Sequence, residues 1–282
     1  MVAEINLNSW EEFQQEVNNL PISRREREQR SPLFRGQSDS NWHLDTTLER
    51  WLTRPQRENV VVMSFIDYYD IISSARPEVE TFTGTNWTTP PQYRIITKEM
   101  DQMGQNYDLM SRELAYGRIP GYEYMAYLRH HGFPSPLLDW TRSPYIAAYF
   151  AFNEALKSEG VSIYMLSEGS FRSGLPGAAT IVRLGPDVKV HRRHVLQQSE
   201  YTMALFNKPE EGYFFARHEN VFEFSKSSKH PEPRFELKKF IIPSRERDKV
   251  LALLDEHNLN AFSLFGSEES LMQTIAIRKL HL

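Results

Sequence analysis

Residues 128–152, LRHHGFPSPLLDWTRSPYIAAYFAF, limit most strongly what this chain can fold into. They place two adjacent histidines, a glycine, two prolines and an Asp-Trp-Thr turn between two apolar stretches. A plain connection between two helices needs only a few residues of turn chemistry, so this density of polar groups against a core indicates a functional site. A hydrogen-bonded structural corner is the alternative, because buried polar groups are usually paired.

Turn signals around this segment predict the elements that hold it. Residues 122–130 are expected to form a helix, because apolar positions recur there and Gly132 follows as a natural stop. Residues 135–138 are expected to be short and extended. Ser143 is a natural N-cap and Pro144 suits a first helical turn, so a second helix should begin there.

Similar signals divide the rest of the chain. An amphipathic helix is expected after Ser9, and residues 31–36, SPLFRG, predict a strand with Arg35 near its end. Residues 45–70 have a helical pattern, whereas residues 81–91 are rich in Thr and Pro and should form an exposed loop suited to substrate selectivity. Further strands are expected at residues 161–166, 180–184, 213–215, 221–224 and 237–242, and further helices at residues 244–257, capped by Ser244, and 271–277.

These elements predict a single α+β domain over residues 1–282, with a mixed or antiparallel sheet core and flanking helices. A helical insertion is expected at about residues 45–125, and a C-terminal helical part at about residues 244–282. With 40% apolar residues, the chain can bury a substantial core.

The composition removes several classes of chemistry. The chain has no cysteine, which excludes thiolate nucleophiles, disulfides and zinc–cysteine sites. A formal net charge of −4 disfavours the broad basic surface of non-specific nucleic-acid binders, although basic patches remain at residues 24–30 and 191–194. No long apolar run could span a membrane and the N-terminus is acidic, so a soluble cytoplasmic protein with no membrane partner is expected.

Several motifs together resemble the FRG domain family, which is named for a Phe-Arg-Gly tripeptide. The tripeptide stands here at residues 34–36 within LFRGQSDSNWHL, after an opening tryptophan helix. The block HHGFPSPLLDWTRSPYIAAYFAF and a late SLFGSEESL are similar to that family as well. The family usually has a Gln-x-Gly-x-Phe pattern near the end of the chain, where this sequence has His218-Glu219-Asn220-Val221-Phe222. Asn is a mild replacement for Gly, because both visit left-handed backbone angles, whereas His for Gln alters the chemistry.

The order of these motifs is in turn similar to that of ADP-ribosyltransferases. The similarity implies an ADP-ribosyltransferase-like fold with an arginine at the end of an early strand, a Ser/Thr-containing strand leading into an apolar helix, and a glutamate on a late strand. Arg35, Ser135 with Thr141, and Glu219 are the counterparts in this chain. It implies NAD as a substrate, an ADP-ribosyltransferase or NAD glycohydrolase activity, and an acceptor that is a nucleic acid or a protein. The family's frequent setting adds a bacterial toxin or phage-defence effector, with an antitoxin or regulatory partner.

The chemistry of NAD cleavage assigns roles to these residues. Breaking the nicotinamide–ribose bond creates positive charge on the sugar, which a carboxylate such as Glu219 would stabilise, and the Arg35 fork would bind the diphosphate. The catalytic candidates are Glu219, Arg35, His131 and His218. The candidates for contact with NAD are Arg35, Gly36, Gln37, His130, Ser135, Asp139, Trp140, Thr141, Tyr145 and Tyr149, and no metal is assigned.

Each role has a structural alternative. Arg35 could form a buried ion pair with Asp139, Glu219 could be a surface residue, and Trp140 with the tyrosines could belong to the core. Two other functions also stay open: a non-catalytic module that binds a nucleotide, a nucleic acid or a protein, and a metal-dependent nuclease. The chain lacks a Gly-x-Ser-x-Gly elbow, a Gly-x-Gly-x-x-Gly loop and a P-loop.

Overall fold

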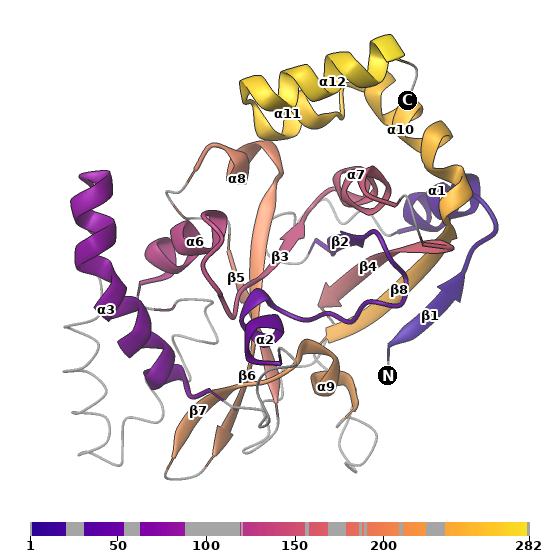
Figure 1. The fold of residues 1–282 in the computed structure, drawn as a ribbon. Coiled ribbons are helices and arrows are strands. Elements are labelled where there is room, and N and C mark those ends of the chain that lie inside the picture. The colour runs from indigo at the N-terminus through magenta and orange to yellow at the C-terminus, as the bar shows by residue number, and fades with distance from the viewer. Residues whose placement is uncertain are drawn as a thin grey trace.

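A mixed sheet runs through the computed structural model of the chain (Figure 1). The structure describes residues 2–20, 31–53, 63–87, 119, 121–155, 158–168, 179–185, 188, 191–208, 211–223 and 235–280. Within these ranges eight strands pair in the order β1-β8-β4-β2-β3-β6-β5, with β7 added to β6, and every pair is antiparallel except β1 with β8. The strands are β1 (Ala3–Asn6), β2 (Leu33–Gln37), β3 (Leu138–Thr141), β4 (Gly160–Glu168), β5 (Thr180–Leu184), β6 (Ser199–Lys208), β7 (Gly212–Phe215) and β8 (Phe235–Pro243).

Helices flank this sheet on both faces, which confirms the expected α+β class with a mixed sheet. The described helices are α1 (Trp10–Asn18), α2 (Thr47–Leu52), α3 (Phe65–Thr83), α6 (Tyr122–His130), α7 (Pro144–Asn153), α8 (Arg193–Leu196), α9 (His218–Glu223), the 3₁₀ turn η2 (Ser244–Glu246), α10 (Arg247–Glu256), α11 (Ala261–Phe265) and α12 (Glu268–Leu280). Helices α1, α7 and α10 pack together against one face, while α3 and α6 lie at the other end of the molecule (Figure 1).

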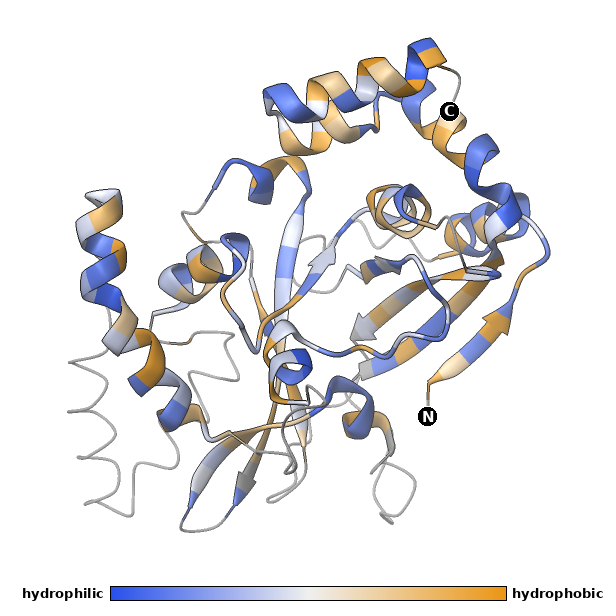
Figure 2. Ribbon diagram, in the orientation of Figure 1, coloured by the Kyte–Doolittle hydropathy of each residue, from blue (hydrophilic) through white to orange (hydrophobic). Residues whose placement is uncertain are grey.

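The strand β4 shows how the sequence produces a hydrophobic core on each face of the sheet. All residues from 161 to 166 are buried, and alternate side chains point to opposite faces of the sheet. Val161, Ile163 and Met165 pack with α1, α7 and α10. Tyr164 and Leu166 pack on the other face, with residues of β3, β8 and α9. In Figure 2, β4 and β8 accordingly carry hydrophobic residues between polar ones.

Capping residues mark several helix starts as the sequence predicts. Ser9 accepts a hydrogen bond from the N–H of Glu12 at 3.4 Å, and Ser143 accepts one from Ile146 at 3.3 Å with Pro144 in the first turn. The expected cap at Ser244 is wrong: its hydroxyl donates to the Glu159 carbonyl, and residues 244–246 form a 3₁₀ turn before α10.

Several other expectations need correction. Residues 221–224 were expected to be a strand, but residues 218–223 form α9, and residue 224 is outside the described ranges. The extended piece expected at 135–138 is the strand β3 three residues later. Residues 81–83 continue α3, and only residues 84–87 of the expected loop are described as coil. The basic patch at 24–30, residues 54–62 of the helical pattern and residues 88–91 of the loop lie outside the described ranges.

Candidate functional site: an arginine-lined cavity

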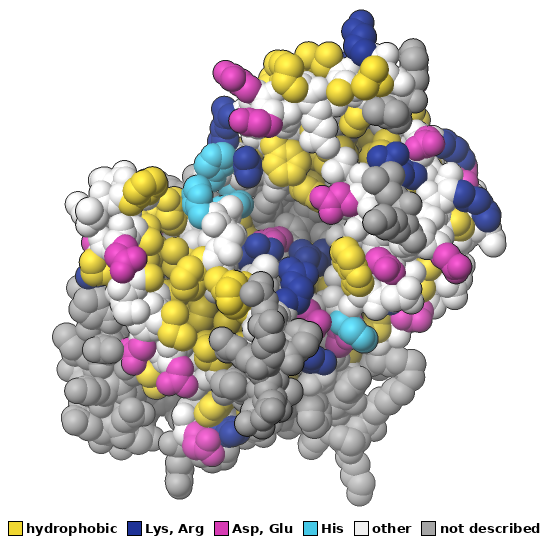
Figure 3. All heavy atoms as spheres, viewed as in Figure 1, with side chains coloured by type: hydrophobic (Ala, Val, Ile, Leu, Met, Phe, Trp, Pro, Cys, Tyr) yellow, Lys and Arg dark blue, Asp and Glu magenta, His cyan; other side chains and the backbone are white. Residues whose placement is uncertain are grey.

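A cavity of about 400 Å³ lies among β2, β3, α6, α7 and α8. Figure 3 shows Lys and Arg side chains gathered in the central hollow of the molecular surface. The cavity is lined by segments far apart in the sequence, so it exists only in the folded chain. Its charged lining residues are Arg35, Arg50, Arg129, Arg193, Asp139 and Glu154.

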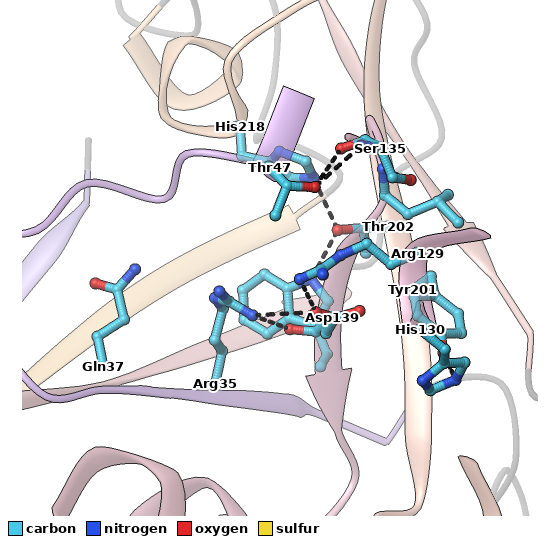
Figure 4. Close-up of polar contacts among 12 residues, drawn as sticks. Arg35, Gln37, Thr47, Arg129, His130, Ser135, Asp139, Tyr201, Thr202 and His218 are labelled. Carbon is cyan, nitrogen blue, oxygen red and sulfur yellow. Dashed lines mark hydrogen bonds and ion pairs between the residues drawn. The ribbon is translucent and has the colours of Figure 1, made fainter. Parts of the chain in front are cut away.

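The cavity begins where β2 and β3 part. These strands are paired only at Phe34 and Thr141. Next to that pair, the Nη1 of Arg35 donates a hydrogen bond of 2.8 Å to the main-chain oxygen of Asp139 and lies 4.0 Å from its carboxylate (Figure 4). A buried carbonyl needs a donor, and here a guanidinium supplies it where a neighbouring strand would otherwise do so. The side chain of Arg35 therefore bridges the opening between the two strands.

A second arginine reaches the same carboxylate. Arg129, from the last turn of α6, forms an ion pair between its Nη2 and the Oδ2 of Asp139 (Figure 4). The side chains of Arg35 and Arg129 are only 15% and 17% exposed, so both cations lie deep in the cavity. Burial lowers the pKa of Arg35 to about 10, while the charge of Asp139 opposes this shift. Arg35 stays protonated at neutral pH, and one carboxylate is shared between two cations.

The remaining charged residues leave the cavity with an excess of positive charge. Arg50 on α2 is exposed, and its side chain forms no hydrogen bond or ion pair with another described residue. The guanidinium of Arg193 lies 5.3 Å from the ring centre of Phe265. The carboxylate of Glu154, which follows α7, also has no hydrogen bond or ion pair within the described ranges. Among the described lining residues, four arginines thus face two carboxylates, and one of these carboxylates is already compensated.

A neutral histidine forms part of the wall. His130 Nε2 lies 2.9 Å from the hydroxyl of Tyr201, and the Tyr201 ring stacks on His194 at 5.8 Å. Burial lowers the pKa of His130 to about 4, although Asp139 opposes the shift. His130 is therefore an uncharged hydrogen-bonding group at neutral pH, and it adds no further cation to the cavity.

His218 is buried behind the cavity wall. It is 1% exposed, and its Nε2 lies 2.8 Å from the Thr202 hydroxyl, which accepts a 2.7 Å hydrogen bond from the indole of Trp140. Burial, with the charge of Arg35 as a smaller cause, lowers the pKa of His218 to about 3. His218 does not line the cavity, whereas Trp140 does. Its contacts make it a support for Trp140.

Glu219 lies on the helix α9, where a strand was expected. Its Oε1 accepts a 3.1 Å hydrogen bond from the N–H of Leu44, and its Oε2 lies 3.0 Å from Nδ1 of His43. The side chain is 24% exposed and is not among the residues that line the cavity with Arg35. It instead holds the segment that carries Trp42, which does line the cavity. The left-handed angle suggested for Asn220 is not used, because Asn220 lies within the helix.

Three further candidate residues contribute to the wall of the cavity. Gly36, Gln37 and Thr141 line the cavity. The amide Nε2 of Gln37 donates to the His43 carbonyl at 2.9 Å, and the Thr141 hydroxyl accepts from the N–H of Ser143 at 3.1 Å.

Besides His218 and Glu219, four more candidates lie away from the cavity lining. Ser135 is fully buried and its N–H donates to Thr47 at 3.0 Å. His131 is exposed, and its ring lies 4.4 Å from that of Tyr127. The other two are core tyrosines of α7: Tyr145 packs edge-on against the N-terminal tryptophan, and Tyr149 is 3% exposed with its pKa raised to about 12 by burial first and then by Glu154.

Sequence reasoning did not name several of the residues that line the cavity as candidates, among them Arg50, Arg129, Arg193, Trp42 and Glu154. Arg129 directly precedes the two histidines, so the central motif could have indicated it as a site residue. Trp42 was noticed only as a family feature. Arg50 and Arg193 belong to helices whose packing against the cavity no local pattern predicts.

Comparison with known proteins identifies part of the chain. Residues 30–160 match the family model of the FRG domain. The chain contains an FRG domain. No curated protein and no solved structure matches the sequence. The matched range includes β2, α6, β3 and α7, which supply most of the cavity, and ends at the start of β4.

The geometry explains the tripeptide that gives the FRG domain its name. Phe34 is 2% exposed and packs into the core beneath α7. Arg35 points to the opposite face, into the cavity (Figure 4). A Cβ atom at Gly36 would lie 1.9 Å from the carbonyl oxygen of Ala147, so only glycine lets α7 approach β2 this closely. The three residues anchor the strand, supply the cation and seat the helix.

Two features are absent from the described residues. No group of three or more His, Asp or Glu side chains in the described ranges is placed to hold a metal ion. No helix in that part of the chain is long and apolar enough to cross a membrane.

Proposed function

We propose that the arginine-lined cavity binds NAD through its diphosphate, and that the chain transfers ADP-ribose to water or to an acceptor. The observation that carries the proposal is the set of four arginines around one cavity, opposed by two carboxylates among the residues that the structure describes. Guanidinium groups bind phosphate oxygens through two parallel hydrogen bonds, which gives both affinity and orientation. Arg35 and Arg129 are held in fixed positions by Asp139, so a diphosphate would meet preorganised donors.

The reaction is a displacement at the sugar carbon. The bond between the anomeric carbon and the nicotinamide nitrogen breaks, and its electron pair stays with nicotinamide, which leaves as a neutral molecule. The positive charge that develops on the ribose is then removed when an oxygen or nitrogen nucleophile bonds to that carbon and loses a proton. Water gives ADP-ribose and a proton, whereas an acceptor group gives an ADP-ribosylated product.

A carboxylate near the ribose would favour this step by opposing the developing charge. Asp139 is less suited to the role, because Arg35 and Arg129 already compensate it. Glu154 lines the cavity and has no ion-pair partner in the described ranges, which supports it as the carboxylate that faces the sugar. His130 is neutral and can hydrogen-bond a ribose hydroxyl without repelling the charged sugar.

The acceptor is proposed more broadly, as a nucleic acid or a protein. An effector role in toxin or phage-defence systems, with an antitoxin or regulatory partner, is part of the same proposal and rests on the family's setting. The mildly acidic chain suits a short strand held in a local groove better than an extended duplex, which would need many neutralised phosphates.

The test measures product formation and binding separately. Purified protein is incubated with NAD labelled in the adenylate part, in the presence of DNA, RNA or protein acceptors, and nicotinamide release and label transfer are followed. ADP-ribose affinity is measured by calorimetry. Arg35→Ala should abolish both binding and product, while the exposed control Arg245→Ala should change neither. Glu154→Gln should keep ADP-ribose affinity and lower turnover by about 100-fold or more.

The outcomes distinguish the enzyme from a binding module. ADP-ribose binding that depends on Arg35, with no NAD-dependent product for any acceptor, would replace the enzyme by a module that uses the same cavity. Equal turnover for the wild-type protein and Arg35→Ala would refute the proposal.

A further inference from the structure

Residues 38–44 form a loop that hydrogen bonds hold in place from both sides. Ser40 N–H donates to the Gly160 carbonyl at 2.8 Å, and the Tyr164 hydroxyl donates to the Trp42 carbonyl at 3.2 Å. The Gln37 side chain donates to the His43 carbonyl at 2.9 Å. The loop thus has a fixed backbone at the edge of the cavity.

Glu219 fastens the same loop at its far end. One carboxylate oxygen accepts from the N–H of Leu44 and the other contacts the ring of His43. Leu44 is then 1% exposed and anchored in the core. Glu219 is therefore the side chain that joins α9 to the loop.

Within this fixed loop, the side chain of Trp42 stays in the open. It is 51% exposed, although it lines the cavity and its neighbour Leu44 is buried. An indole gains free energy when its large apolar face is covered, so a rigid loop that keeps one exposed beside a cationic cavity leaves that face available to a ligand.

We infer that Trp42 is a stacking platform for the heterocyclic base of a phosphate-bearing ligand, and that Glu219 is the positioning residue that holds this platform. The inference rests on the proposed function, because the arginines bind the phosphates of the same ligand. Any base can stack on tryptophan, because stacking uses the flat face of the ring and not its hydrogen-bonding groups. Arg50 is also exposed at the cavity and can bind a phosphate next to the stacked base.

The stacked base could belong to NAD itself or to a single-stranded nucleic-acid acceptor. Both offer the same chemistry, a ring joined through a sugar to phosphate. The ligands used in the test are therefore ADP-ribose, a short single-stranded oligonucleotide, and inorganic pyrophosphate as an anion with no ring.

Intrinsic fluorescence gives the first measurement. The ring-bearing ligand should quench tryptophan emission in the wild-type protein and in the control Trp51→Ala, whose indole is exposed on α2 outside the cavity lining. Trp42→Ala should lose the quenching and bind that ligand about tenfold or more weakly, with pyrophosphate affinity unchanged. Trp42→Phe should recover most of the affinity but not the quenching, because phenylalanine still stacks.

A double-mutant cycle then tests Glu219. Glu219→Ala should weaken the ring-bearing ligand like Trp42→Ala, and the double variant should be no weaker than either single one, because both act through one platform. Glu219→Gln keeps an oxygen for the N–H of Leu44 and should lose less affinity. Circular dichroism and the melting temperature check that each variant is folded.

The results separate this inference from the proposed function. Ring-bearing ligands that bind no better than pyrophosphate, or a loss that is the same for pyrophosphate, would overturn the stacking role and leave the anion site standing. Full ADP-ribose affinity with abolished turnover in Glu219→Gln would overturn the positioning role and return Glu219 to catalysis. Stacking of an oligonucleotide without any NAD-dependent product would support the platform and refute the enzyme. No binding of any of the three ligands would overturn both.

Discussion

The contact between β2 and α7 gives a sharp prediction at Gly36. A Cβ at this position would lie 1.9 Å from the Ala147 oxygen, 2.7 Å from the Ala151 nitrogen and 2.9 Å from the Ala147 carbonyl carbon. Carbon and oxygen atoms normally approach to about 3.3 Å, so α7 would have to move by about 1.4 Å. All three atoms are main-chain atoms, and no side-chain rotation can relieve the clash.

Gly36→Ala should therefore lower the free energy of unfolding by about 3 kcal/mol or more, at the upper end of the cost of overpacking. For a chain of this size the melting temperature should fall by about 6–12 °C. Urea unfolding followed by circular dichroism measures both values. Since the cavity also depends on α7, ADP-ribose affinity should fall in the same variant.

Gly185→Ala is the matched control, because a Cβ there would meet nothing within 4 Å and the backbone needs no positive φ. It should change stability by about 0.5 kcal/mol or less. The double variant Gly36→Ala/Ala147→Gly should stay destabilised, since the clash involves the main chain of residue 147. A Gly36→Ala protein as stable as the control would show that β2 and α7 do not meet in this way.

Two further predictions concern buried charges. The pKa values of His218 and His130 are lowered to about 3 and about 4, below about 6.5 in the unfolded chain, so the unfolded state takes up protons first. The free energy of unfolding should be retained above pH about 6.5 and fall as the pH drops toward 4. Urea titrations at several pH values should show a weaker pH dependence for His218→Gln. Parallel curves of unfolding free energy against pH for this variant and the wild-type protein would contradict the reasoning. Arg183→Ala should cost about 3–5 kcal/mol in urea unfolding, because it leaves Glu200, 1% exposed and paired with Arg183 at 2.7 Å, without its main partner. Arg278→Ala, which breaks an exposed pair with Asp255, should cost about 1 kcal/mol or less, and equal losses for the two variants would refute the distinction.

The parts of the fold that local chemistry determines could be predicted from the sequence. The Ser143-Pro144 start of α7 needs only a cap and a first-turn proline, and both act within one turn. The strand β6 was missed, because SEYTMALFNK alternates weakly and its pairing with β3, β5 and β7 is long-range. At α9, Val221 and Phe222 suggested a strand, but tertiary packing places Phe222 in the core from a short helix.

In the candidate site, too, residues within compact motifs could be predicted, whereas those that depend on long-range packing could not. Arg35, Asp139 and Trp140 could be predicted because they belong to two compact motifs, and the structure brings them together at one opening in the sheet. The carboxylate that faces the sugar could not be predicted in this way. Glu219 was expected in this role because a strand would point alternate side chains toward one face of the sheet.

The helix α9 instead turns Glu219 toward the loop that carries Trp42, which changes what a mutation there can report. A loss of activity in a Glu219 variant would follow both from a catalytic role and from a displaced indole. Only an assay that separates ADP-ribose affinity from turnover distinguishes them, since a displaced platform weakens binding of the ring whereas a missing catalytic carboxylate does not. Glu154 gives the complementary case: it lines the cavity and holds no loop, so its loss should reduce turnover while affinity is kept.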